Sequence, residues 1–169
     1  IYYYMKNLQE HIRKVLNKIK NEKKNWYNFI KTTSFEELPY EYKKSLIIYM
    51  YEGDVVDWSI DLDRDVVSQN DKLIKTLIND YESTGRLRHK SFGYGVVPMK
   101  ILTDEITDRL GYDSFEEYHK DYGDNTDHGS SVLPVILSFD NDELIEDGWH
   151  RFHSYYRKGL KNIPVVVFM

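Results

Sequence analysis

Apolar side chains recur three and four residues apart along the first half of the chain, as they do on the buried face of a helix. This spacing predicts an amphipathic helix over residues 5–24, carried by Leu8, Ile12, Val15, Leu16 and Ile19. Further helices are predicted around residues 42–50 and 72–81. We therefore expect residues 5–92 to form a helical N-terminal segment.

The pattern is shorter and more mixed after residue 92. Residues 93–95, Gly-Tyr-Gly, predict a flexible turn, and residues 96–102 predict a strand. Thr103 or Asp104 is then expected to cap a helix, and Ser114 to cap the next one.

The C-terminal part carries the clearest pattern. Residues 132–139 predict a strand that pairs back through residues 143–146 as a hairpin. Apolar positions at helical spacing predict a helix over 149–160, and residues 163–168 predict a buried strand. The order of hairpin, helix and strand indicates an α+β domain over residues 93–169.

The composition excludes several kinds of functional site. The chain has no cysteine, which excludes disulfides, thiolate metal sites and a cysteine nucleophile. No apolar run approaches the ~20 residues that a membrane span requires. We therefore expect a soluble, cytoplasmic protein without a membrane partner.

Charge is distributed unevenly along the sequence. Residues 1–24 carry seven Lys and Arg against two Glu, whereas residues 103–147 carry fourteen Asp and Glu against one Arg and one Lys. The acidic middle would repel a nucleic-acid backbone, so a nucleic acid or an acidic protein is expected to contact the basic N-terminal helix. The alternative, which charge patterning favours, is that this helix packs on its own acidic domain.

An anion site is predicted between the hairpin and the last helix. In Asp147-Gly148-Trp149-His150-Arg151, a glycine allows a tight turn and two basic side chains fall in the first turn of the helix. A helix N-terminus offers free backbone N–H groups and a partial positive charge, and phosphate is the anion it usually binds. The alternative is a capped helix, with Asp147 as N-cap and His150 and Arg151 in solvent.

The same turn resembles that of the ParB/sulfiredoxin superfamily. The similarity lies in the Asp-Gly-x-His-Arg turn within residues 145–152 and in the Gly and Ile-Pro-Val strand within residues 159–167. Residues 97–102 and 134–137 also resemble strands of that superfamily, so the resemblance covers about residues 96–168. It implies a small mixed sheet with helices, in an α+β fold that the helical segment precedes.

The resemblance also implies a ligand. In that superfamily the turn, here Gly148, Trp149, His150 and Arg151, binds nucleotide phosphates, so ATP or another nucleotide is the expected cofactor. Sulfiredoxin chemistry is excluded, because Trp149 stands where those enzymes place their cysteine. ParB partition proteins add a helix-turn-helix domain after this fold, so a partition role is not expected for a chain that ends at Met169.

The first functional interpretation is that this turn belongs to a Mg²⁺-dependent phosphotransferase or NTPase. Free-serine kinases of the superfamily combine the turn with a carboxylate base after the first strand, where Asp104 and Glu105 stand. Glu146 and Asp147 could hold Mg²⁺, which takes one or two carboxylates with phosphate oxygens and water. The alternative is that Glu146 faces solvent and that Asp104 and Glu105 only cap a helix.

A non-catalytic binding module is the second functional reading. Arg86, Arg88 and Lys90 form a basic cluster that could bind a nucleic-acid backbone beside a stacking Tyr94, although a solvated loop is the commoner arrangement. The composition and size would suit a phage or mobile-element accessory protein, and the many Tyr and Trp residues allow a homodimer.

The last predicted helix carries two histidines on one face. His150 and His153 are three residues apart, which is a spacing that metal pairs use. No third ligand follows at a suitable spacing, and a histidine at a helix interface is the more common case.

Overall fold

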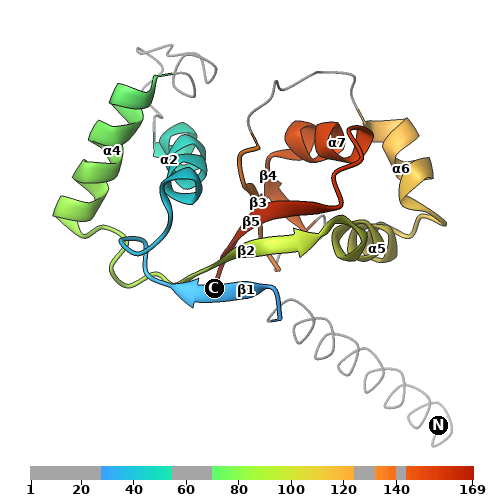
Figure 1. Ribbon diagram of the computed structural model, residues 1–169, viewed down its shortest axis with the longest axis horizontal. Coiled ribbons are helices and arrows are strands. Elements are labelled where there is room, and N and C mark those ends of the chain that lie inside the picture. The colour runs from blue at the N-terminus through green and yellow to red at the C-terminus, as the bar shows by residue number, and fades with distance from the viewer. Residues whose placement is uncertain (1–27, 55–69, 124–131, 140–143) are drawn as a thin grey trace, which may run out of the picture.

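A computed structural model describes residues 28–54, 70–123, 132–139 and 144–169 (Figure 1). The predicted amphipathic helix over residues 5–24 lies outside these ranges. Within them the chain forms one five-stranded sheet with helices on both of its faces.

The sheet has the strand order β1-β2-β5-β3-β4. Its strands are β1 (Ile30–Thr33), β2 (Phe92–Pro98), β3 (Val135–Leu137), β4 (Ile145–Asp147) and β5 (Asn162–Phe168). β5 pairs in parallel with β3, and every other neighbouring pair is antiparallel. The protein is therefore a mixed α/β structure, and β5 is the central strand.

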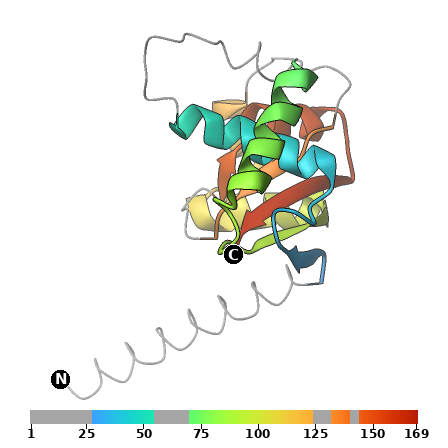
Figure 2. The ribbon, with the colours of Figure 1, turned by 90° about the vertical axis from the view of Figure 1, so that its left-hand side faces the viewer.

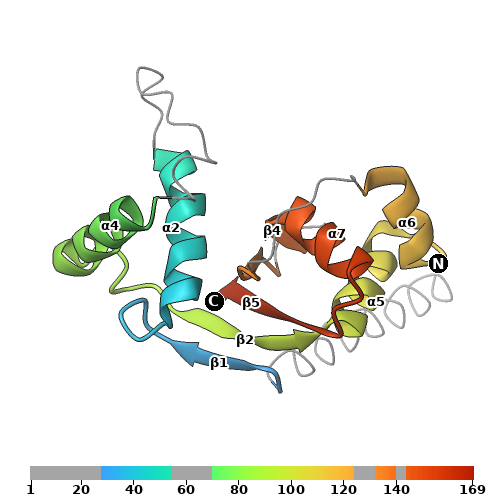
Figure 3. The same cartoon turned by 45° about the horizontal axis from the view of Figure 1, so that its top comes forward.

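The helices divide between the two faces of the sheet (Figures 1 and 3). One face is covered by α2 (Tyr40–Asp54), and α4 (Asp71–Thr84) packs on the outside of α2 (Figure 2). The other face carries α5 (Met99–Leu110), α6 (Phe115–Tyr122) and α7 (Trp149–Arg157).

Alternate side chains of β5 pack into the two cores on opposite faces of the sheet. Val165 and Val167 belong to the core beneath α5, α6 and α7, whereas Val166 belongs to the core beneath α2. All three valines are fully buried. This is the environment of a strand buried on both faces, and it confirms the prediction made from the apolar run over residues 163–168.

Several local predictions are confirmed. β3 and β4 form the predicted hairpin, although each has only three residues. Ser114 caps α6, because its hydroxyl accepts a hydrogen bond from the backbone N–H of Glu117. The helix predicted around residues 72–81 is α4, and Gly85 follows it directly in a left-handed conformation, as a C-terminal glycine does.

The expectation of an all-helical N-terminal segment is wrong for residues 30–33. They form the edge strand β1, in which Ile30 and Thr33 are buried. The predicted turn at residues 93–95 is also wrong, since these residues lie within β2 and pair with β1. A Cβ on Gly95 would lie 1.9 Å from the backbone oxygen of Phe29, so glycine serves here to let two backbones approach.

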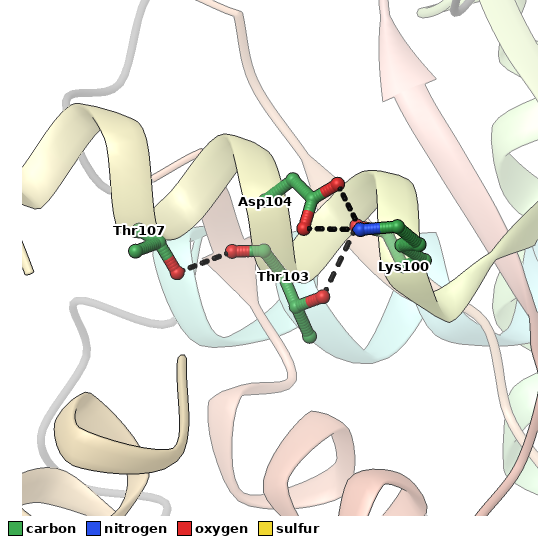
Figure 4. Close-up of polar contacts among 4 residues, drawn as sticks. All are labelled: Lys100, Thr103, Asp104 and Thr107. Atoms are coloured by element: carbon green, nitrogen blue, oxygen red, sulfur yellow. Dashed lines mark hydrogen bonds and ion pairs between the residues drawn. The ribbon is translucent and has the colours of Figure 1, made fainter. Parts of the chain in front are cut away.

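The predicted strand over residues 96–102 ends earlier than expected. β2 stops at Pro98 and α5 begins at Met99, whose N–H donates to the backbone oxygen of Lys161. Thr103 and Asp104 therefore lie inside the helix and do not cap it. The Thr103 hydroxyl donates instead to the carbonyl of Lys100, one turn earlier (Figure 4).

Elements from both sides of the predicted boundary at residues 92 and 93 contribute to this one sheet. β1 pairs with β2, and α2 lies over β3 and β5. None of the helices that the structure describes is long and apolar enough to cross a membrane.

Candidate functional site: the turn between β4 and α7

The turn between β4 and α7 depends on a left-handed glycine. Gly148 has φ 94° and is the N-cap of α7. Its carbonyl accepts the N–H of Phe152, which is the first hydrogen bond of the helix, and no side chain caps the helix start. Asp147 is therefore not the N-cap, contrary to the simpler interpretation of the sequence.

Arg151 lies back over this turn and pairs with Asp147. Its Nη2 is 2.9 Å from Asp147 Oδ2, and the two side chains are only 13% and 10% exposed. A Cβ on Gly148 would lie 2.9 Å from the same Nη2, so glycine also leaves room for the guanidinium. The alternative in which Arg151 is solvated is wrong: its charge stays at the start of α7 and is bound by a carboxylate there.

Helix α2 brings a buried hydroxyl to the same place. Ser45 is fully buried, and its Oγ lies 3.5 Å from Arg151 Nη1 while donating to the backbone oxygen of Pro134 at 3.1 Å. Ser45 is 106 residues from Arg151 in sequence, and no local motif marks it.

Tyr49, one turn further along α2, reaches the other acidic residue of the turn. Its hydroxyl donates to Glu146 Oε1 at 2.6 Å. This hydrogen bond, together with burial and the charges of Glu146 and Asp147, raises the pKa of Tyr49 to about 12. Glu146 is an exposed residue, as one reading of the hairpin predicted, and its carboxylate is held by a phenol.

The two predicted Mg²⁺ ligands thus have protein partners. Tyr49 binds Glu146 and Arg151 binds Asp147. Among the residues that the structure describes, no three His, Asp or Glu side chains form a group that could hold a metal ion.

The predicted catalytic carboxylates are paired within α5. Asp104 is exposed, and Figure 4 shows it turned toward Lys100, whose Nζ lies 2.8 Å from Asp104 Oδ2. Glu105 is 10% exposed and accepts a hydrogen bond of 2.6 Å from Arg109 Nε. Arg109 also donates to the backbone oxygen of Phe139 after β3. Both acids therefore have basic partners on their own helix.

The predicted nucleic-acid residues lie together on the connection between α4 and β2. Arg86, Arg88 and Lys90 are all exposed. Arg86 lies over the ring of Tyr81, with its Cζ 5.6 Å from the ring centroid. Tyr94 is not available as their stacking partner, because it packs edge-on against Tyr42 with ring centroids 5.1 Å apart.

The two histidines of α7 have different surroundings. His150 is exposed next to Arg151, whereas His153 is buried at the interface with α6, which confirms the commoner role for such a residue. Its Nδ1 lies 2.6 Å from Nδ1 of His119. His119 is a residue of this interface that the sequence did not single out.

Comparisons of the chain with protein-family models, with curated proteins and with solved structures gave no match. The resemblance to the ParB/sulfiredoxin superfamily therefore stays a prediction from the residues of the turn and of the neighbouring strands.

Proposed function

We propose that the turn formed by Gly148, Trp149, His150 and Arg151 binds the phosphates of a nucleotide such as ATP. The observation that carries the proposal is the start of α7, where a left-handed glycine replaces a side-chain cap and a guanidinium lies over it. The partial positive charge of the helix end and the cation beside it both favour a phosphate.

The order of elements also supports the proposal. A strand, the Asp-Gly-x-His-Arg turn, a helix, a glycine and a further strand follow one another as the superfamily resemblance implies. In the structure these are β4, the Gly148 turn, α7, Gly159 and β5.

The ion pair between Asp147 and Arg151 favours a nucleotide that arrives with Mg²⁺. A bare phosphate would have to compete with Asp147 for the guanidinium. A Mg²⁺ nucleotide brings a partner for each member of the pair, because the cation takes carboxylate oxygens and the phosphate takes guanidinium donors. The proposal concerns binding, since phosphoryl transfer would also need a base, and Asp104 and Glu105 have partners on α5.

Thermal unfolding with ATP, CTP, GTP and UTP, each with and without Mg²⁺, tests the proposal. A ligand at a hundred times its Kd should raise Tm by roughly 5–10 °C for a domain of this size. The rise should require Mg²⁺ and disappear in Arg151→Ala. Arg151→Lys, which keeps a charge beside Asp147, should retain part of it.

Lys72→Ala is the control, because Lys72 is an exposed basic residue of α4 outside both the turn and the basic connection after α4. The ligand-induced rise in Tm is the quantity to compare, since Arg151→Ala also lowers the stability of the unliganded protein by removing the ion pair with Asp147. An equal rise in the wild type and in Arg151→Ala would reject the turn as the binding site.

The exposed basic connection after α4 supports a second candidate function, the binding of nucleic acid or of an acidic protein. Arg86, Arg88 and Lys90 are all exposed on this connection. Binding through phosphate contacts should weaken steeply as salt rises, and each contact that is removed should reduce the salt slope by about one. Affinity for single-stranded and duplex DNA at several salt concentrations, in the wild type and in Arg86→Ala/Arg88→Ala, would decide this.

A further inference from the structure

Two histidines join α6 to α7 through their ring nitrogens. Nδ1 of His119 on α6 and Nδ1 of His153 on α7 are 2.6 Å apart. The rings are stacked, with centroids 4.8 Å apart and an interplanar angle of 21°. His153 is only 3% exposed and His119 is half-buried, so this contact is partly shielded from water.

The contact can exist only in some protonation states. A hydrogen bond between two Nδ1 atoms needs a proton on one ring and a lone pair on the other. The neutral pair meets this condition, and so does the pair with one added proton. When both rings are imidazolium, two N–H donors and two positive charges face each other at this distance, and the contact must break.

Burial and a neighbouring cation oppose a positive charge on His119. On α6 the neighbouring rings are Phe115 and Tyr118, and on α7 they are Trp149 and Tyr156. The charged group of α7 that acts on His119 is Arg157, a cation. Burial first, and Arg157 second, lower the pKa of His119 below its ordinary value.

We propose that His119 and His153 form an acid-sensitive clasp that holds α6 against α7 at neutral pH and releases it when both rings are protonated. Released, α6 would expose the aromatic side chains that now lie between the two helices. Trp149 of the turn packs on Tyr118 of α6, with ring centroids 5.6 Å apart, so opening of the clasp would also remove a contact of one residue of the turn at the start of α7.

Hydrogen exchange followed by mass spectrometry between pH 7.5 and 5.0 tests this proposal in the full chain. After correction for the intrinsic pH dependence of exchange, amides of α6 should exchange roughly three- to tenfold faster at pH 5.0. This is the factor expected for the loss of one buried hydrogen bond. Amides of α4, on the far side of α2, should change little.

His119→Asn is the informative variant. The asparagine amide places a donor or acceptor close to where Nδ1 stood, does not titrate, and has a helix propensity similar to that of histidine. Exchange of α6 in this variant should lose its pH dependence. His89→Asn makes the same change at an exposed histidine on the connection between α4 and β2 and should keep the wild-type pH dependence.

His153→Asn provides a second variant should His119→Asn fold poorly. The proposal is overturned if α6 in the wild type exchanges no faster at pH 5.0 than at pH 7.5, or if both asparagine variants keep the wild-type response. These outcomes do not depend on whether the turn at Gly148 binds a nucleotide.

Discussion

Single side chains of α2 tie the N-terminal part of the protein to the candidate site. Tyr49 donates a hydrogen bond of 2.6 Å to Glu146, and its ring packs on Phe168 with centroids 6.0 Å apart. The ring and the hydroxyl thus make separate contacts, and a substitution can remove one and keep the other.

Tyr49→Phe should lower the free energy of unfolding by about 1 kcal/mol at neutral pH, because only the hydrogen bond is lost. In the folded protein the pKa of Tyr49 is raised to about 12, above the ordinary 10. The contribution of the neutral hydroxyl is therefore fully present below pH 10 and lost as pH rises toward 12. Denaturant unfolding at several pH values is the measurement. The unfolding free energies of the wild type and of Tyr49→Phe should converge as pH rises from 10 toward 12.

Tyr51→Phe is a suitable control for that series. Tyr51 lies on the same helix, and its hydroxyl makes no hydrogen bond within the described residues. If Tyr51→Phe and Tyr49→Phe have the same effect, the contact with Glu146 does not contribute to stability.

At the scale of elements, periodicity predicted the long helices and the C-terminal hairpin, helix and strand. It failed for β1, which has only four residues and buries just the first and the last of them. That pattern is neither the alternation of a strand nor the spacing of a helix. The second strand was predicted over residues 96–102, whereas β2 runs from Phe92 to Pro98. Gly93 and Gly95 suggested a turn, but both lie in the strand because they pair with β1.

Only part of the candidate site could be predicted from the sequence. The Gly148 turn could be predicted because its residues are consecutive in the sequence. Ser45 and Tyr49 come from α2 instead, 106 and 97 residues away from their partners Arg151 and Glu146. Contacts of that kind follow from the packing of α2 on the sheet. The pairing of Arg151 with Asp147, four residues earlier, could have been anticipated from their spacing.

Gly95→Ala tests the close approach of β1 and β2. The new Cβ would meet a backbone oxygen at 1.9 Å, so the strands must separate, and we expect a loss of about 3 kcal/mol in unfolding free energy. Gly93→Ala in the same strand is the matched control, because its Cβ would first meet the end of the flexible Ile30 side chain at 2.9 Å. Equal losses in chemical denaturation would refute the proposed role of Gly95.

For the molecule as a whole, the decisive feature is a sheet with a core on each face. Leu46 of α2 packs in the core with Ile136 and Val166, while Leu102 of α5 packs in the other core with Val165. Neighbouring residues of β5 therefore serve both cores, and neither core is complete without this strand.

Leu46→Ala should lower the free energy of unfolding by about 3 kcal/mol, the typical loss for a large-to-small change in a core. It should also reduce the protection of α7 amides from hydrogen exchange as much as that of α2 amides. Leu102→Ala, the corresponding change in the other core, should do the same. Hydrogen exchange resolved by segment is the measurement. Normal protection of α7 in Leu46→Ala would mean that residues before and after position 92 unfold as separate domains.

The central position of β5 also has a consequence for biosynthesis. β5 follows the other four described strands in chain order, yet it lies between β2 and β3 and is the only strand that joins them. Until it leaves the ribosome, the β1–β2 ribbon and the β3–β4 hairpin have no shared partner, and the apolar faces of both stay open to solvent. We expect the nascent chain to depend on chaperones until β5 emerges, and then to fold in one step.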